Sequence, residues 1–190
     1  AQRQAYTDGL TKLANRKHLD EFLETQIEYS RQTGKPCSLI MLDVDNFKHY
    51  NDTNGHQFGD EVLKWIGRAL RESVRSSDLA ARYGGEEFSV VLPETRKEMA
   101  AVVAEKVRRS ITDRKYPNQE KQPLGFVSAS LGVATFEDDA KSGEELIKAA
   151  DAALYQSKHR GRNCVTVANQ GPRMPDEPAG TDPAGAARRA

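Results

Sequence analysis

The sequence predicts an α/β (α+β) fold with the central order βαββαβ, additional helices and an edge strand. Short apolar runs bounded by proline, glycine or acidic residues alternate with longer segments whose apolar residues recur every three or four positions. These are the patterns of buried strands and amphipathic helices. The chain has 190 residues, enough for one domain with some sequence left over, and 37% of them are hydrophobic, so it can bury a core.

The first half of the chain is predicted to contribute two helices and a strand. Asn15 is suited to cap a helix that ends near Gly34. Residues 37–44 form an apolar run bounded by a proline and by acidic residues, which indicates a buried strand. Apolar residues at helical spacing predict a second helix around 58–70.

The second half is predicted to hold a hairpin, two helices and two further strands. Residues 79–83 and 88–92 flank Gly84 and Gly85 and are expected to be the two strands of the hairpin. Capping boxes, in which a Ser or Thr precedes a Glu by three positions, predict where helices begin. Thr95 and Glu98 are expected to begin a helix with an apolar face at Met99, Val102, Val103 and Val107. Ser142 and Glu145 are expected to begin a second helix that ends at about Gly161. The remaining elements are a strand over 126–136 and an edge strand over 163–167.

The two ends of the chain differ from this alternating pattern. Residues 1–6 hold no signal that begins a fold, and we expect them to be a connector stub from an upstream domain. Residues 169–190 are rich in Pro, Gly and Ala and are expected to be a disordered tail, because they offer too little apolar surface to offset the entropy of ordering. The folded domain is therefore predicted to cover 7–168.

Composition excludes several classes of partner. Lys+Arg 28 balance Asp+Glu 28, and the pI is near 7.1, so a nucleic-acid partner is not expected. The longest apolar stretch, 38–42, is too short to cross a bilayer, and no signal peptide is recognisable, which predicts a cytoplasmic domain without membrane contact. Whether the full-length protein is membrane-anchored stays open. Cys37 and Cys164 are expected to be reduced core thiols.

Acidic residues gather at three places in the predicted fold. Asp43 and Asp45 end the first strand, Glu86 and Glu87 follow the glycine pair, and Asp60 lies in the first turn of a helix. Each alone has a plain alternative, since acids cap loops and favour helix starts. In a βαββαβ sheet, however, the end of the first strand and the hairpin turn can be neighbours. Carboxylates brought together there favour a hard cation such as Mg²⁺.

Glycine and basic residues extend this prediction to a phosphate site. Gly84 and Gly85 let a phosphate or sugar approach the backbone closely, although a tight hairpin can use them merely for positive φ. Lys48, Lys158 and Arg162 are candidates to complete a polyphosphate site, although the last two also suit a helix C-terminus.

Four ordered blocks carry a resemblance to a known family. The heptapeptide Arg82-Tyr83-Gly84-Gly85-Glu86-Glu87-Phe88 resembles the signature of the GGDEF family of diguanylate cyclases in its GGEEF variant. Residues 8–16, 43–60 and 152–163 resemble the other blocks of the family, in the family's order. The resemblance spans about residues 7–167. It implies a palm-like sheet, as in nucleotidyl cyclases, and a domain that condenses two GTP into cyclic di-GMP and two pyrophosphates.

The resemblance also implies a metal site and a base. Mg²⁺, with Mn²⁺ possible, is held in the family by residues that match Asp43, the carbonyl of Val44, Glu86 and Glu87. Either Glu86 or Glu87 is expected to accept the proton of the attacking hydroxyl, or the metal lowers the pKa of that hydroxyl enough to make a base unimportant. Because one domain positions one GTP, the resemblance implies a C2 homodimer with the reaction at its interface.

Substrate-binding residues follow from the same match. Asn51 and Asp60 match positions that recognise guanine, and the positions of His56 and Leu63 lie close by. Lys48, Lys158 and Arg162 match positions that neutralise the triphosphate. The full expected set for the substrate is Phe47, Lys48, Asn51, His56, Asp60, Leu63, Gly84, Gly85, Lys158 and Arg162.

A second site is expected away from the catalytic residues. Arg75 and Asp78 have the spacing of the family's RxxD inhibitory site, where cyclic di-GMP binds as product and inhibitor. In an unrelated protein the same two residues would be a surface ion pair worth ~0–1 kcal/mol. A second basic partner is expected at Lys106, Arg108 or Arg109, and the sequence does not choose among them.

An alternative remains open beside the enzyme. A catalytically silent domain of the same fold would sense GTP or cyclic di-GMP for a partner protein. Such a domain would be expected to lack signature acids, whereas Asp43, Glu86 and Glu87 are all present here. The sequence therefore favours the cyclase.

Overall fold

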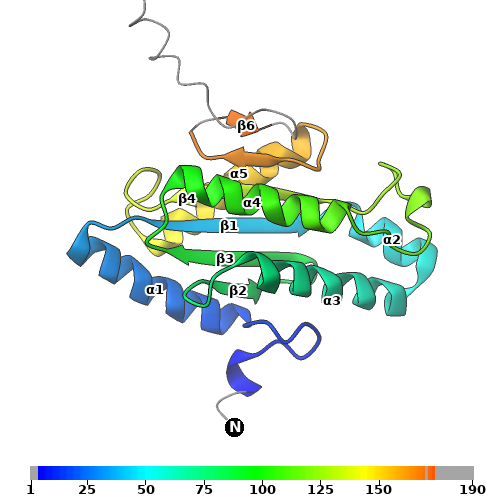
Figure 1. Cartoon of the computed structure of the whole chain (residues 1–190), viewed down its shortest axis with the longest axis horizontal. Coiled ribbons are helices and arrows are strands. Elements are labelled where there is room, and N and C mark those ends of the chain that lie inside the picture. Colours follow the sequence, from blue (N-terminus) through cyan, green and yellow to red (C-terminus); the bar gives the residue numbers. More distant parts are fainter. Residues whose placement is uncertain (1–3, 170, 174–190) are drawn as a thin grey trace, which may run out of the picture.

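A six-stranded sheet with helices on both faces forms the core of the molecule (Figure 1). The computed structural model describes residues 4–169 and 171–173. The helices are α1 (Arg16–Thr33), α2 (Phe47–Asn54), α3 (His56–Ser73), α4 (Lys97–Thr112) and α5 (Gly143–His159), with short 3₁₀ turns at Gln4–Tyr6 and Gln119–Lys121. The strands are β1 (Cys37–Val44), β2 (Leu79–Arg82), β3 (Glu87–Pro93), β4 (Ala129–Thr135), β5 (Val165–Val167) and β6 (Gly171–Arg173).

The strand order β2-β3-β1-β4-β5-β6 places β1 inside the sheet. β1 pairs antiparallel with β3 and β4, β4 pairs parallel with β5, and every residue of β1 is buried. In this register Asp43 lies opposite Glu87 on one side and opposite Ser130 on the other. The predicted βαββαβ order is confirmed, and it brings the end of β1 beside the start of β3.

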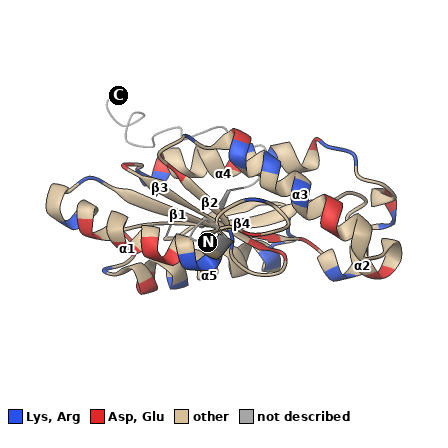
Figure 2. Ribbon diagram, turned by 90° about the horizontal axis from the view of Figure 1, so that it is seen from below, with Lys and Arg blue, Asp and Glu red and all other residues tan. Residues whose placement is uncertain are grey.

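Alternate residues of β1 point to two separate cores. Ile40 and Leu42 belong to the core under α3 and α4, whereas Leu39 and Met41 belong to the core under α1 and α5. Figure 2 shows the two helix pairs on opposite sides of the sheet. The two helices of the βαββαβ unit, α3 and α4, lie on one face. The other face is covered by α1 and α5, which flank that unit in the chain.

Local signals account for most of the helix ends. The side chain of Asn15 accepts a hydrogen bond from the backbone N–H of His18, and α1 ends at Gly34 with φ 73°. Ser142 caps α5 in the same way, by accepting from the N–H of Glu145. The helix predicted around 58–70 is confirmed as α3. A separate helix, α2, precedes it, and the two meet at Gly55 with φ 91°.

Two sequence predictions were wrong in detail. Thr95 does not cap α4, whose N-cap is Arg96 without a side-chain hydrogen bond. Met99 and Val102 are exposed, and α4 instead packs a small-residue face, including Ala100 and Ala104, against the sheet. Small side chains allow close packing, which hydrophobicity alone does not reveal.

The end of the fold also differs from its prediction. β5 is not an edge strand, because β6 pairs with it through Thr166 and Pro172. β6 lies within the segment predicted as a tail, Asn169 lies in a turn before it, and residues 170 and 174–190 of that prediction lie outside the described residues. Residues 1–3 of the predicted connector stub also lie outside the described residues, and Gln4–Tyr6 forms a 3₁₀ turn. Cys37 and Cys164 are buried free thiols, and burial raises the pKa of Cys37 to about 12. No helix among the described residues is long and apolar enough to span a membrane.

Candidate active site

A pocket lies at the carboxyl end of β1. That end of the strand lies close to α2 (Figure 1). The walls of the pocket come from the end of β1 and the start of α2, from the hairpin turn, and from the end of α5. The lining residues are Asp43, Val44, Asp45, Asn46, Phe47, Lys48, Glu86, Lys158 and Arg162. Topology thus gathers carboxylates and basic groups that are distant in the sequence.

Asp43 is an acid of this pocket whose pKa is raised by its surroundings. Its carboxylate is buried and accepts a hydrogen bond from Nζ of Lys158 on α5. Burial raises the pKa of Asp43 to about 6; Lys158 opposes the rise, while the charges of Glu86 and Glu87 add to it. Lys158 therefore offsets only part of the cost of burying this carboxylate.

The two signature glutamates lie beside Asp43 in different ways. Glu87 is the cross-strand partner of Asp43, so both side chains emerge on the same face of the sheet. Glu86 precedes β3, accepts a hydrogen bond at 3.1 Å from the N–H of Val44 through its backbone, and lines the pocket. Asp151 on α5 adds a further acid. Burial and the Glu87 charge raise the pKa of Asp151 above its usual range.

Gly85 faces open space, whereas a β-carbon on Gly84 would lie 3.1 Å from Oε2 of Glu87, and neither glycine supplies a left-handed turn. Neither Gly84 nor Gly85 has a positive φ, and a β-carbon on Gly85 would meet nothing within 4 Å. Arg82 fixes the loop by donating to the carbonyl of Gly85 at 2.8 and 3.0 Å, and Asp8 pairs with Arg82 at 3.4 Å. The bare backbone of Gly85 thus leaves room for a ligand to approach.

The donor set of the pocket fits a hard divalent cation. Asp43 and Glu86 supply carboxylate oxygens, and Val44 supplies its backbone carbonyl oxygen. Mg²⁺ prefers oxygen ligands of this kind. Among the described residues, no three His, Cys, Asp or Glu side chains already stand in metal-binding geometry. Lys158 supplies the positive charge beside Asp43 in this state.

The predicted guanine residues lie along α2 and α3. The side-chain oxygen of Asn51 is buried without a hydrogen-bond partner. It lies 1.7 Å from the position that a β-carbon on Gly59 would occupy. Asp60 lines a separate groove on α3. His56 is exposed at the start of α3, while Leu63 is buried in the core. Asn51 thus has an unused acceptor, as a residue awaiting a hydrogen-bonding ligand would have.

The predicted phosphate-binding residues differ in their present partners. Lys48 is exposed and pairs with Asp52 along α2 at 2.8 Å, whereas Lys158 pairs with Asp43. Arg162 is exposed, lines the pocket, and has a left-handed backbone with φ 65°. All three residues line the pocket, so the structure brings them together as predicted.

Arg75 and Asp78 form a tight pair at the end of the loop after α3. Asp78 accepts from the backbone N–H of Arg75 at 2.8 Å and from its guanidinium at 3.0 Å. The same guanidinium donates to Pro93 and Thr95 at 3.0 and 2.9 Å. The Asp78 side chain is 2% exposed and that of Arg75 is 58% exposed, so the arginine offers an open face to solvent.

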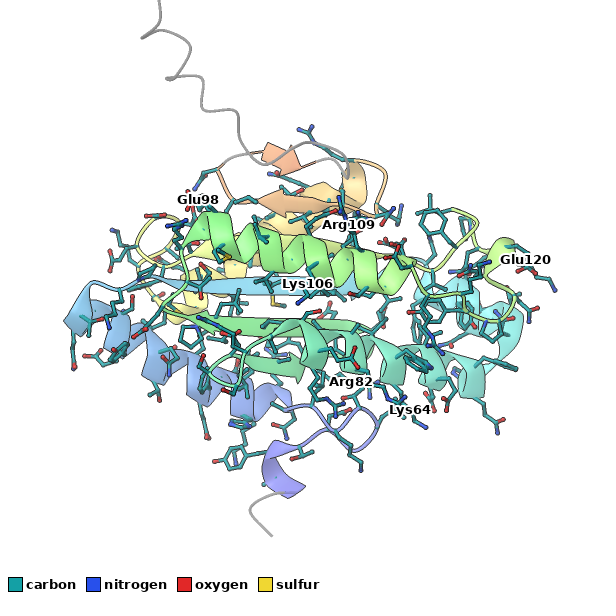
Figure 3. All side chains as sticks on the ribbon, in the orientation of Figure 1. Lys64, Arg82, Glu98, Lys106, Arg109 and Glu120 are labelled. Carbon is teal, nitrogen blue, oxygen red and sulfur yellow. The ribbon has the colours of Figure 1, made fainter. Side chains whose placement is uncertain are left out.

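The candidates for a second basic partner differ in their present contacts. Arg108 is buried and donates to Glu105 and Asn163, so it is already engaged in the core of the fold. Lys106 and Arg109 are exposed on α4, where Figure 3 labels both. Arg109 also donates to Glu105 at 3.1 Å.

Sequence reasoning missed several residues that hold the pocket together. Asp8 and Arg82 anchor the signature loop, yet they were noted only as parts of a resemblance. Gln122, in the connection between α4 and β4, donates to the carbonyl of Asn46 at 3.1 Å and contacts His49 at 2.9 Å. No local pattern marks such long-range contacts, so only a structure reveals them.

Comparisons with known proteins agree with the fold and with the family resemblance. A family model described as "Diguanylate cyclase, GGDEF domain" matches residues 5–164. The chain is 41% identical over 160 residues to "Diguanylate cyclase DosC" of Escherichia coli (strain K12), covering 84% of this chain and 34% of that protein. It is 38% identical over 161 residues to "Response regulator PleD" of Caulobacter vibrioides (strain NA1000 / CB15N), covering 85% and 36%. The chain thus spans about a third of the length of these relatives.

Solved structures show the same similarity. The GGDEF domain of DgcB from Caulobacter crescentus, in complex with c-di-GMP, superposes with a TM-score of 0.80 at 39% identity, covering 87% of this chain and 94% of that one. The active GGEEF domain of a diguanylate cyclase from Vibrio cholerae superposes with a TM-score of 0.77 at 30% identity, covering 84% and 99%.

Proposed function

The chain belongs to the GGDEF family of diguanylate cyclases, and from this premise we propose that it condenses two GTP into cyclic di-GMP and releases two pyrophosphates. The observation that carries the proposal is the convergence of Asp43 and Glu86 with Lys158 and Arg162 in one pocket. Two acidic and two positively charged side chains around one cavity suit a nucleoside triphosphate and its cation.

Each residue has a part in the proposed reaction. Lys48, Lys158 and Arg162 bind the triphosphate, the open backbone at Gly85 admits it, and Gly84 lets the loop pack against Glu87. Asn51 and Asp60 recognise the guanine edge through an acceptor oxygen and a carboxylate, which match the N–H donors of guanine. Phe47 and Leu63 support the walls of the guanine site, and His56 flanks its entrance.

Asp43, Glu86 and the carbonyl of Val44 would hold the divalent ion, with Glu87 in support. When bound, such an ion stabilises charge on the triphosphate and lowers the pKa of a nearby hydroxyl. Lys158 contacts Oδ2 of Asp43, and in the proposed complex it would neutralise the phosphates while the cation supplies positive charge to the carboxylate.

The proposed chemistry is an in-line phosphoryl transfer carried out twice. The 3′-hydroxyl of one GTP attacks the α-phosphorus of the other, a new P–O bond forms, and the bond to the β-phosphate breaks. Pyrophosphate leaves with its electron pair, and the proton of the hydroxyl passes to Glu86, to Glu87 or to solvent. Since the domain positions one GTP, two copies must face each other, so the active species is a C2 homodimer.

Product control is proposed at the second site. Arg75 offers a planar guanidinium with an exposed face, held in place by the buried Asp78. Phosphate and guanine groups of cyclic di-GMP suit this fork. Lys106 and Arg109 are the exposed candidates for the second basic partner.

The test is incubation with GTP and Mg²⁺ followed by chromatography for cyclic di-GMP, over a range of protein concentrations. We expect activity that rises faster than linearly with protein, because dimerisation limits it. A rate strictly proportional to protein across the dimerisation range would contradict the dimer. Binding of GTP without product at high concentration, after bound nucleotide is removed, would identify the silent sensor and overturn the cyclase.

A further inference from the structure

Asp45 lies two residues after Asp43, but the structure gives its carboxylate a different task. The residue is 3% exposed, and both of its oxygens accept hydrogen bonds from the protein. Ser130 donates to Oδ1 at 2.6 Å, while Ser128 and the backbone N–H of Asn163 donate to Oδ2 at 2.7 and 3.0 Å. Three donors converge on one buried acid.

These contacts join three parts of the chain. Asp45 follows β1, Ser128 and Ser130 lie at the start of β4, and Asn163 lies in the turn between α5 and β5. The donor and acceptor residues are 83 to 118 positions apart in the sequence. Asp45 is therefore a single point at which the metal-binding strand end meets the turn that carries Arg162.

That turn has an unusual backbone. Gly161, Arg162 and Asn163 have φ values of 106°, 65° and 48°. Residues with a β-carbon rarely adopt such values, so two of them in succession are strained and need support from outside the turn. Asn163 receives that support at two atoms, because its N–H donates to Asp45 and its side-chain oxygen accepts from Arg108 at 2.8 Å.

We infer that Asp45 is a positioning residue that fixes the turn carrying Arg162 against the strand end carrying Asp43 and Val44. The inference rests on the proposed function, in which Arg162 binds phosphate and Asp43 holds a cation. A carboxylate suits this role because it accepts several hydrogen bonds at once, and charge-assisted bonds are the stronger ones. Residues that orient ligating groups in this way typically contribute about 10–100-fold to affinity or activity.

Two substitutions separate positioning from metal ligation. Asp45→Ala removes all three hydrogen bonds. Asp45→Asn keeps an acceptor for Ser128 and Asn163 and turns its amide toward Ser130, whose hydroxyl can accept instead. We expect Asp45→Ala to weaken Mg²⁺-dependent binding of a GTP analogue with an α,β-methylene bridge by about 10–100-fold, and Asp45→Asn to restore most of the loss.

Asp139 offers a matched control at the other end of β4. Its side chain is 1% exposed and accepts hydrogen bonds from Lys97, Asn169 and the N–H of Thr135. Asp139→Ala therefore removes as many bonds from an equally buried acid, away from the pocket. We expect Asp139→Ala to lower the melting temperature while the folded protein keeps the affinity for the analogue and the initial rate of the unsubstituted chain.

Equilibrium binding of the analogue, initial rates and thermal denaturation are measured on every variant. Unchanged binding by Asp45→Ala would overturn the inference, and so would a loss in Asp45→Asn as large as that in Asp43→Asn, which would make Asp45 a ligand. If Asp45→Ala does not fold, Ser130→Ala takes its place with a smaller expected loss, and no loss would again overturn it. An unsubstituted chain that binds the analogue but makes no cyclic di-GMP overturns the cyclase proposal alone.

Discussion

Two acid–base pairs in this molecule are built in opposite ways. Arg75 and Asp78 are three positions apart in one loop, and the acid holds both the backbone and the guanidinium of its partner. Asp43 and Lys158 are 115 positions apart and meet only because β1 and α5 pack together. The first pair is a local structure, whereas the second exists only in the folded domain.

This difference has a consequence for ligand binding. Asp78 is fully engaged and Arg75 keeps an exposed face, so a ligand can bind the arginine without breaking the pair. At Asp43 the proposed cation needs the carboxylate that now holds Lys158. In the proposed function the local pair is therefore already formed for its ligand, whereas Lys158 of the long-range pair would exchange Asp43 for the phosphates.

The largest effect is expected at the long-range site. Asp43→Ala and Glu86→Ala remove proposed cation ligands, so each should lower kcat at least about 1000-fold, since electrostatic stabilisation of the transition state is lost. Chromatographic product assays measure the loss, and calorimetry measures binding of cyclic di-GMP at the local pair, which should persist. Cyclase rates near those of the unsubstituted chain in either variant would refute the metal assignment.

Arg75→Ala should affect binding of cyclic di-GMP and leave the initial cyclase rate nearly unchanged. Removing its charged hydrogen bonds should weaken cyclic di-GMP binding about 10–100-fold, while the initial rate stays nearly constant because Arg75 does not line the catalytic pocket. Progress curves at rising product concentration give the inhibition constant. Arg96→Ala, which removes an exposed arginine of the loop before α4, serves as the control. Inhibition that is equally strong in Arg75→Ala and the control would show that the product acts elsewhere.

Asp60→Ala tests the guanine site, where an effect of similar size is expected on the choice of nucleotide. Losing one acceptor for guanine N–H groups should reduce the preference for GTP over ATP by about 10–100-fold. The ratio of kcat/KM for the two nucleotides measures this preference. Glu61→Ala, next in the same groove, is the control because its carboxylate pairs with Lys64. Unchanged selectivity in Asp60→Ala would remove this acid from the guanine site.

Sequence reasoning predicted what local signals encode and missed what packing decides. Asn15, Ser142 and Gly34 mark helix ends through their own hydrogen bonds or backbone angles, and the structure confirms them. Thr95 carries the same type of signal, but its hydroxyl donates to Pro93 and accepts from Arg75, so it does not cap α4. Tertiary contacts there take the place of the local motif.

The site shows the same division. The acids Asp43 and Glu86 were identified from their positions at a strand end and a hairpin turn, because the sheet topology follows from the order of elements. Asp45 was noted with them as part of an acidic cluster. Its partners Ser128 and Ser130 carry no motif, and Asn163 only ends a block of the family resemblance, so the contacts that support Asp45 do not follow from the sequence.

Gly59→Ala is expected to have the smallest effect and makes the sharpest test of the guanine site. A β-carbon on Gly59 would lie 1.7 Å from Oδ1 of Asn51 and 3.2 Å from Phe47, so the Asn51 side chain must move. Alanine inside a helix is favoured over glycine by about 1 kcal/mol, so a weakened α3 would not account for a loss of binding. We expect the KM for GTP to rise about 10-fold, with Gly9→Ala as a control because its β-carbon would meet nothing within 4 Å. If the KM for GTP stays constant while Asp60→Ala loses selectivity, guanine is recognised from α3 alone, and the unpartnered oxygen of Asn51 has another purpose.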